Sequence, residues 1–461
     1  MVATQDIDLE KSPPDRSSGA ISLAWSELTV ETEPVSGRRC FGLVRGEARP
    51  ARTILDRVSG VARPGEVLAI MGASGAGKST LLNSLTFRHS EGLRISGSRL
   101  ANHQLLSPAS LTALSGYVQQ EDLFIPSLTV REHLMFQARL RLEASLTTAE
   151  RKRRVEEVVR QVGLTSVADA IIGDEKLKGI SGGEKKRLSF AAELLSNPSV
   201  LFCDEPTSGL DSFMAANIME LLREFSRLDK TVVCTIHQPS SQIFTRFDSL
   251  LLLAEGKTAY LGPAVSTKQF FAGLGFPCPQ DYNPADHFVS VLAVLEGEEE
   301  ESKERISTIC AGFQQSQAGA DLGAELKSIE RQEESDQEEE RLAQSLYKAS
   351  WLQQLAALTR RQALSVVRNP MMFKVKIFTA IVVGLILGVL YQGQDFDQKG
   401  IQNANGALFV IITNLSFGSI FSICNSFCTE LLVFLRSVRL GISQVNFILF
   451  LQGAFQRDLS D

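Results

Sequence analysis

Several features that would point directly to a class of protein are missing from this chain of 461 residues. The 7 cysteines are odd in number and scattered, so they have neither the spacing of a zinc site nor that of a disulfide framework. Lys and Arg number 47 against 53 Asp and Glu, and the net charge of −6 excludes a nucleic-acid binder that works through bulk basic charge. Hydrophobic residues at 44% exclude a wholly disordered chain, and the length requires more than one structural unit.

Long apolar runs are absent until about residue 371. The first 20 residues are polar and carry Asp6, Asp8 and Glu10 where a signal peptide needs a basic flank and an apolar run. We therefore expect residues 1–20 to be disordered, no secretory cleavage, and a soluble body that stays in the cytosol.

The last ninety residues, in contrast, hold two apolar stretches. They predict a partial transmembrane domain over 371–435, with spans at about 371–391 and 406–428. Lys374 and Lys376 near the start of the first span can extend to the membrane surface. The alternative for each stretch is a buried helix of a soluble protein. Basic residues precede the first span, which places the N-terminal body and the divergent tail, 436–461, in the cytosol.

Residues 21–295 alternate short apolar runs with longer amphipathic stretches, the pattern of an α/β domain. Three runs read as buried parallel strands: VLAIM (Val67 to Met71), VLFC (Val200 to Cys203) and VVCTI (Val232 to Ile236).

Two segments of different composition follow this domain. Residues 296–345 are acidic and poor in aromatics, which predicts a solvated linker or exposed helix rather than a packed segment or an acidic binding site. Residues 346–370 have apolar residues at helical spacing, so we expect an amphipathic connecting helix that ends before Asn369-Pro370. This helix either packs on the soluble body or lies at the membrane surface. Its position directly before a span favours the membrane surface.

A phosphate-binding loop directly follows the first predicted strand. Gly72, Ala73, Ser74, Gly75, Ala76, Gly77, Lys78 and Ser79 fit the pattern G-x-x-x-x-G-K-[ST], and a predicted helix begins with Ser79 and Thr80. Glycines let the backbone N–H groups face phosphates, and the helix N-terminus adds positive potential. Lys78 can then neutralise β- and γ-phosphate charge, while the Ser79 hydroxyl can ligate Mg²⁺.

Two further motifs carry polar groups suited to the same chemistry. Asp204 and Glu205 end the strand VLFC, where Asp204 would hold Mg²⁺ through water and Glu205 would orient or deprotonate the attacking water. Ser181, Gly182, Gly183 and Glu184 precede a helical stretch. In isolation this second motif is an ordinary helix-capping turn.

Taken in order, six motifs resemble the nucleotide-binding domain of an ATP-binding cassette (ABC) transporter. They are GASGAGKS, Gln120 in GYVQQED, the signature SGGEKKR, LFCDE, the loop Ser208 to Asp211, and His237 in TIHQP. The cassette preceding the membrane part, HQPSSQIF and YNPAD are similar to subfamily G, the White or eye-pigment half-transporters. The resemblance implies an α/β P-loop NTPase over 21–295 followed by α-helical transmembrane segments.

The resemblance also implies roles for these residues. Two cassettes would close head to tail, so that Ser181, Gly182, Gly183 and Glu184 of one chain face the ATP held by residues 72–80 of the other. Ser79, Gln120 and Asp204 would hold Mg²⁺, and Glu205, His237 and Gln120 would form the catalytic set. Asp211 would bridge the two subunits at the nucleotide.

The function expected is that of an ATP-hydrolysing half-transporter in a multi-pass membrane protein of the plasma membrane or of intracellular vesicles. As a homodimer, or a heterodimer with another subfamily G half-transporter, it would move a small hydrophobic or pigment-precursor-like compound across the bilayer. Subfamily G members have six spans and this chain has room for about two, so we expect a truncated chain. Two alternatives are a non-transporting regulatory isoform that sequesters partner half-transporters, and a soluble ATPase with a packed apolar tail.

Overall fold

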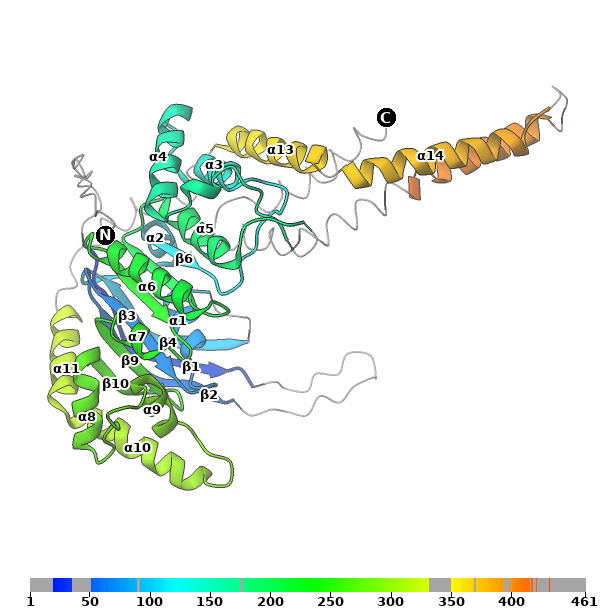
Figure 1. Ribbon diagram of the computed structural model, residues 1–461. Helices are drawn as coiled ribbons and strands as arrows, with labels where there is room; N and C mark the ends of the chain where they lie inside the picture. Colours follow the sequence, from blue (N-terminus) through cyan, green and yellow to red (C-terminus); the bar gives the residue numbers. More distant parts are fainter. Residues whose placement is uncertain are drawn as a thin grey trace. The chain divides into compact units, whose positions relative to one another are not determined.

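The computed structural model describes residues 20–34, 51–88, 92–174, 177–330, 350–368, 370–393, 398, 400–414, 416–417, 420 and 431 (Figure 1). The predicted disordered residues 1–19 and the predicted tail 436–461 lie outside the described residues. The chain divides into two compact units. Residues 1–120 and 197–342 form the sheet unit, and residues 121–196 and 343–461 form the helical unit.

A six-stranded sheet is the centre of the sheet unit. Its strand order is β10-β9-β3-β8-β7-β6, and every neighbouring pair is parallel except β9 with β10. The strands are β3 (Val67–Gly72), β6 (Ser115–Val118), β7 (Val200–Asp204), β8 (Thr231–Thr235), β9 (Ser249–Ala254) and β10 (Lys257–Pro263). The three predicted buried parallel strands are thus confirmed. Their carboxyl ends meet at one edge of the sheet, where the polar motifs follow.

A second, antiparallel sheet of the same unit has the order β2-β1-β4-β5. It consists of β1 (Leu23–Thr32), β2 (Thr53–Ala62), β4 (Leu93–Ala101) and β5 (Gln104–Leu105). The helices of the unit are α1 (Lys78–Leu85), α2 (Pro108–Leu114), α6 (Ser212–Ser226), α7 (Ser241–Phe244), α8 (Thr267–Gly273), α9 (Pro284–Val291), α10 (Glu299–Gln315) and α11 (Gln317–Glu330), with a short 3-10 turn at Ala264–Ser266.

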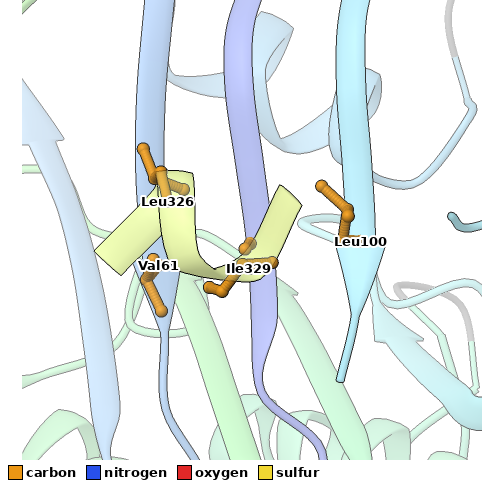
Figure 2. Close-up of a cluster of buried hydrophobic side chains, with 5 residues drawn as sticks. Val61, Leu100, Leu326 and Ile329 are labelled. Carbon is orange, nitrogen blue, oxygen red and sulfur yellow. The ribbon is translucent and has the colours of Figure 1, made fainter. Parts of the chain in front are cut away.

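Helix α11 packs on the antiparallel sheet, although its sequence is part of the acidic segment. Figure 2 shows Leu326 and Ile329 beside Val61 and Leu100, and Ala24 completes this buried cluster. Each buried aliphatic side chain of this size contributes roughly 1.5–3 kcal/mol relative to an exposed one.

Helix α10 is buried on one side in the same way. Ile306, Ile309, Cys310 and Phe313 are buried at helical spacing, and the acidic residues of the first turn lie outside this face. The prediction of a solvated linker over 296–345 is therefore wrong for residues 299–330. Acidic residues dominate the composition of this segment, whereas its burial follows from the helical period of its apolar residues.

The helical unit contains the helices α3 (Val130–Arg141), α4 (Thr148–Gln161), α5 (Gly182–Leu194), α13 (Trp351–Arg368) and α14 (Pro370–Leu390), with a 3-10 turn at Thr165–Val167. Reciprocal capping boxes begin α3 and α4, with Thr129 and Glu132 in the first and Thr147 and Glu150 in the second. Between α3 and α5, Arg141 donates two hydrogen bonds to the buried carboxylate of Glu193, at 2.6 and 2.7 Å.

Helix α13 is the predicted connecting helix of 346–370, and it ends before Asn369 as expected. It packs against α3: Ala357 is buried with Leu140 and Phe136, and the Arg361 guanidinium lies 5.2 Å from the centre of the Phe136 ring. Helix α13 thus packs on its own unit along one side, through Ala357 and Leu358, whereas Leu352 and Val367 are exposed. A position of this exposed side at the membrane surface stays a prediction.

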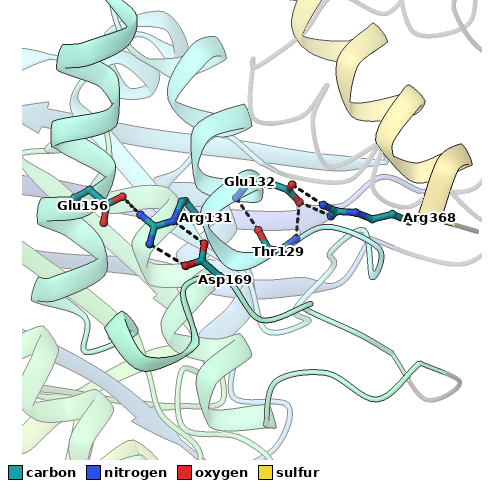
Figure 3. Close-up of polar contacts among 6 residues, drawn as sticks. All are labelled: Thr129, Arg131, Glu132, Glu156, Asp169 and Arg368. Carbon is teal, nitrogen blue, oxygen red and sulfur yellow. Dashed lines mark hydrogen bonds and ion pairs between the residues drawn. The ribbon is translucent and has the colours of Figure 1, made fainter.

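A charged contact closes the end of this helix pair. Arg368 of α13 donates to both carboxylate oxygens of Glu132, at 2.5 and 2.8 Å (Figure 3). One residue earlier on α3, Arg131 pairs with Glu156 of α4 and with Asp169. These bonds join α13 and α4 to the start of α3.

Helix α14 covers most of the first predicted span. In the second predicted span, residues 406–414, 416, 417 and 420 are helical, and the others lie outside the described residues. Within the described part of the chain, none of the helices combines the length and apolar character needed to cross a membrane.

Candidate nucleotide site

The predicted phosphate-binding loop connects β3 to α1. Gly77 precedes α1 with φ +100, and a Cβ there would lie 2.6 Å from the Leu55 side chain. At Gly72 a Cβ would lie 2.2 Å from the Leu253 carbonyl oxygen, so neither position accepts a larger residue without rearrangement. Because Gly77 has no side chain to cap α1, the first N–H groups of the helix are available to an anion.

Lys78 lies folded over this loop. Its Nζ donates to the carbonyl oxygens of Gly72 and Ala73, both at 2.9 Å, and only 7% of the residue is exposed. Burial lowers the pKa of Lys78, and the nearby Glu205 carboxylate opposes this shift. The ammonium of Lys78 is thus poorly solvated, and a phosphate group bound in the loop would neutralise its charge.

The two predicted carboxylates follow β7. Thr235 at the end of β8 donates through Oγ1 to Asp204 Oδ1 at 2.7 Å and accepts from the Glu205 backbone N–H at 2.9 Å. Glu205 has a left-handed backbone with φ +44. The Tyr117 hydroxyl lies 3.5 Å from Asp204 Oδ2, and burial together with this carboxylate raises the pKa of Tyr117. Asp204 and Glu205 are therefore held by groups from neighbouring strands.

Gln120 reaches the same corner from the end of β6. Its Nε2 donates to Glu205 Oε2 at 2.7 Å. The structure therefore brings Gln120, Glu205 and Lys78 together, although 85 residues separate the first two in sequence. The exposed Ser79 and the half-buried Thr80 begin α1 beside them.

His237 and Asp211 lie on loops of the same unit. His237 is exposed, follows β8, and lines a pocket of about 430 Å³ together with Thr207, Asn283 and Asp286. Asp211 is the N-cap of α6, where its Oδ1 accepts from the Met214 N–H at 2.9 Å.

The signature motif begins α5 of the helical unit. Ser181 Oγ accepts from the Glu184 N–H at 3.3 Å, and Glu184 Oε2 accepts from the Ser181 N–H at 2.7 Å. The Glu184 carboxylate is thus engaged in capping α5, and the capping box alone accounts for the position of this side chain. Gly182 is exposed and Gly183 is buried.

Comparisons with known proteins place these motifs in a family. The family model described as "ABC transporter" matches residues 55–208, and two models described as "ABC-2 type transporter" match residues 237–360 and 353–454. Protein white of Drosophila melanogaster is 43% identical over 452 residues, which cover 94% of this chain and 65% of the relative. The chain is homologous to the subfamily G half-transporters of the ABC family. This homology confirms the predicted fold class and implies ATP as the ligand of the phosphate loop.

Other members of subfamily G match over the same extent. The "ABC transporter ATP-binding protein/permease wht-3" of Caenorhabditis elegans is 38% identical, covering 92% of this chain and 66% of the relative. The "Broad substrate specificity ATP-binding cassette transporter ABCG2" of Mus musculus is 35% identical, covering 87% of this chain and 63% of the relative. This chain thus spans slightly under two-thirds of the length of these relatives.

Thr235, Tyr117 and Asn283 were missed by sequence reasoning. Thr235 could have been found, because parallel strands in adjacent positions bring residues at their carboxyl ends together, and Thr235 is directly opposite Asp204. Asn283 belongs to the YNPAD motif, which carried only a resemblance, and no spacing in the sequence links it to the loop after β8.

Proposed function

We propose that this chain is an ATP-hydrolysing half-transporter that works as a dimer. The observation that carries the proposal is the meeting of Lys78, Gln120 and Glu205 at the carboxyl ends of the parallel strands of one sheet. Phosphoryl transfer to water requires a cation that binds the phosphates and polar groups that orient the attacking water. Lys78 supplies the cation, and the Gln120 amide and the Glu205 carboxylate supply the polar groups.

Mg²⁺ is the cofactor that fits the oxygen groups here. Ser79 supplies a hydroxyl, Asp204 a carboxylate and Gln120 an amide, all of which suit a hard cation. When bound, Mg²⁺ would neutralise charge on the phosphates. Glu205, fixed by Gln120 through its side chain and by Thr235 through its backbone, would accept a proton from the attacking water.

Lys78 has a second role in this mechanism. Its bonds to Gly72 and Ala73 hold the ammonium against the backbone of the loop. A phosphate would offer Nζ a charged acceptor in place of two neutral carbonyl oxygens, and charge-assisted bonds are about twice as strong.

The dimer follows from the family resemblance. Ser181 and Gly183 of one copy would face the γ-phosphate of the ATP held by the other, His237 would contact that phosphate, and Asp211 would lie between the two copies. The second copy is an identical chain or another subfamily G half-transporter.

Transport is proposed on the same basis. The cassette would lie in the cytosol, attached to a membrane part in the plasma membrane or in vesicles, and ATP closure would drive exposure of a substrate site. A small hydrophobic or pigment-precursor-like compound is proposed as the substrate from the resemblance of the motifs to the White or eye-pigment half-transporters.

Hydrolysis can be tested with purified full chain in detergent. We expect Glu205→Gln to lower kcat by about 10²-fold or more while ATP binding persists, because only the acceptor of the water proton is lost. Glu224→Gln, an exposed carboxylate change on α6, is the matched control and should leave kcat unchanged. Unaltered hydrolysis by Glu205→Gln would remove the assigned role.

A further inference from the structure

The YNPAD motif lies against the loop that carries His237. Asn283 Nδ2 donates to the carbonyl oxygen of Pro239 at 2.9 Å, a contact between segments 44 residues apart. The loop from His237 to Pro239, here called the switch loop, thus has a partner outside its own strand.

The switch loop is fixed at two points. At its start, the Ile236 N–H donates to the Ile70 carbonyl of β3 at 3.0 Å. At its end, the carbonyl of the buried Pro239 accepts from Asn283. His237 and Gln238 lie between these two anchors, so the second anchor determines how the chain leaves His237.

Neither residue between the anchors is held by burial. Both are exposed, and His237 borders the open pocket of about 430 Å³. Gln238 has φ +46, a left-handed conformation that is unfavourable for a residue with a side chain and persists where the surroundings impose it. A restraint on the loop backbone is therefore the structural means of keeping His237 in one place.

Asn283 is itself rigidly placed. Its Oδ1 accepts from the Ala285 N–H at 3.3 Å and caps α9, and its Nδ2 also donates to Asp286 Oδ2 at 2.8 Å. Phe288 of the same helix stacks on Phe271 with ring centres 4.6 Å apart. The amide that holds Pro239 is thus part of a packed helix start.

We propose that Asn283 is a positioning residue for ATP hydrolysis, acting through the Pro239 carbonyl to hold His237 where it meets the γ-phosphate. This inference rests on the proposed function. The YNPAD motif then has a role within its own cassette: Asn283 at the start of α9 fixes the geometry of the switch loop.

Two substitutions separate this role from helix capping. Asn283→Ser keeps a capping hydroxyl for α9, since serine is as good an N-cap as asparagine, but it is too short to replace the amide bond to Pro239. Asn283→Ala removes both. Ser107→Ala, which removes the N-cap of α2 in the same unit, controls for the loss of a cap.

The assay measures kcat for ATP and the ratio of ATP to ADP affinity, using full-length chain in detergent. We expect Asn283→Ser to lower the melting temperature by no more than the Ser107→Ala control does, while kcat falls about tenfold. ADP affinity should not change, because His237 meets only the γ-phosphate. Ser107→Ala should lower the melting temperature and leave kcat per folded molecule unchanged.

A double-mutant cycle decides whether Asn283 acts through His237. The affinity ratio is measured for wild type, His237→Ala, Asn283→Ser and the double variant, so the cycle remains readable if hydrolysis falls to background. We expect Asn283→Ser to have no further effect once His237 is alanine.

Different failures have different meanings. If His237→Ala leaves kcat and the affinity ratio at wild-type values, the role of His237 in the proposed function is wrong. If His237→Ala lowers both but Asn283→Ser lowers neither, or lowers them equally in the His237→Ala background, the positioning role of Asn283 is overturned.

Discussion

Thr235→Val tests whether one buried hydroxyl holds both the Asp204 carboxylate and the Glu205 backbone. Thr235 is fully buried, and its Oγ1 serves Asp204 and the Glu205 N–H together. Valine keeps the shape but leaves the N–H without this acceptor and the carboxylate without this donor. A lost bond to a charged group costs about 1.5–3 kcal/mol and an orphaned buried N–H about 1–3 kcal/mol, so we expect a total of about 2–4 kcal/mol because the losses overlap.

Thr235→Ser is the matched control, because it keeps the hydroxyl and removes one methyl group, at a cost of about 1 kcal/mol. For a unit of this size 1 kcal/mol corresponds to about 2–4 °C. Scanning calorimetry of the full chain should therefore place the valine variant about 10 °C below wild type and the serine variant about 3 °C below it.

ATPase assays below both transitions should separate the two variants further. Because a displacement of about 1 Å can cost 10²-fold, we expect kcat to fall about 10- to 100-fold in Thr235→Val and less than threefold in Thr235→Ser. A valine variant as stable and as active as the serine variant would refute the reasoning.

Three further predictions concern other parts of the chain. Ile329→Ala should destabilise the sheet unit by about 2–4 kcal/mol if α11 packs as described, and exposed Lys327→Ala should not, as urea denaturation would measure. Alkylation at pH 8 should modify Cys278 before Cys310 or Cys234, because burial raises the pKa of Cys310 to about 11 and that of Cys234 to about 12, and peptide mapping would detect the order. Arg368→Ala should lower the free energy of unfolding by about 1 kcal/mol at pH 7. Desolvation raises the pKa of Glu132, but the bonds from Arg368 and Thr129 outweigh desolvation, so the pKa of Glu132 is lowered on folding. The stabilisation is therefore present above the unfolded pKa of Glu132 and is lost as the pH falls through the folded pKa, so denaturation curves should show the difference between variant and wild type shrinking below about pH 4.

The parts of the fold that could be predicted are those fixed by local pattern. The apolar runs at Val67, Val200 and Val232 predicted β3, β7 and β8, because strands buried on both faces need continuous apolar sequence. The loop from Gly72 to Lys78 could be predicted because its glycines and its lysine are at the spacing needed to bind the phosphates of a nucleotide.

The contacts that could not be predicted join segments distant in the chain. Strand order places Thr235 beside Asp204, and the packing of α9 places Asn283 beside Pro239. The acidic composition around α10 does not show its buried face, because charged residues on the exposed side of a helix do not prevent apolar residues from packing on the other side. The period of α13 is compatible both with packing on the body and with a place at the membrane surface, since an apolar stripe does not specify what covers it.

The claim that two copies share each ATP is tested most directly by complementation. Lys78→Ala and Ser181→Arg chains, each inactive alone, are co-expressed with different tags and the mixed dimer is purified. One site of this dimer then combines an intact phosphate loop with an intact signature from the other chain. We predict that ATPase activity returns in the mixed dimer, to about half the wild-type rate if the two sites act independently. A stable mixed dimer as inactive as its parents, or parents that hydrolyse ATP at the wild-type rate as monomers, would contradict the account.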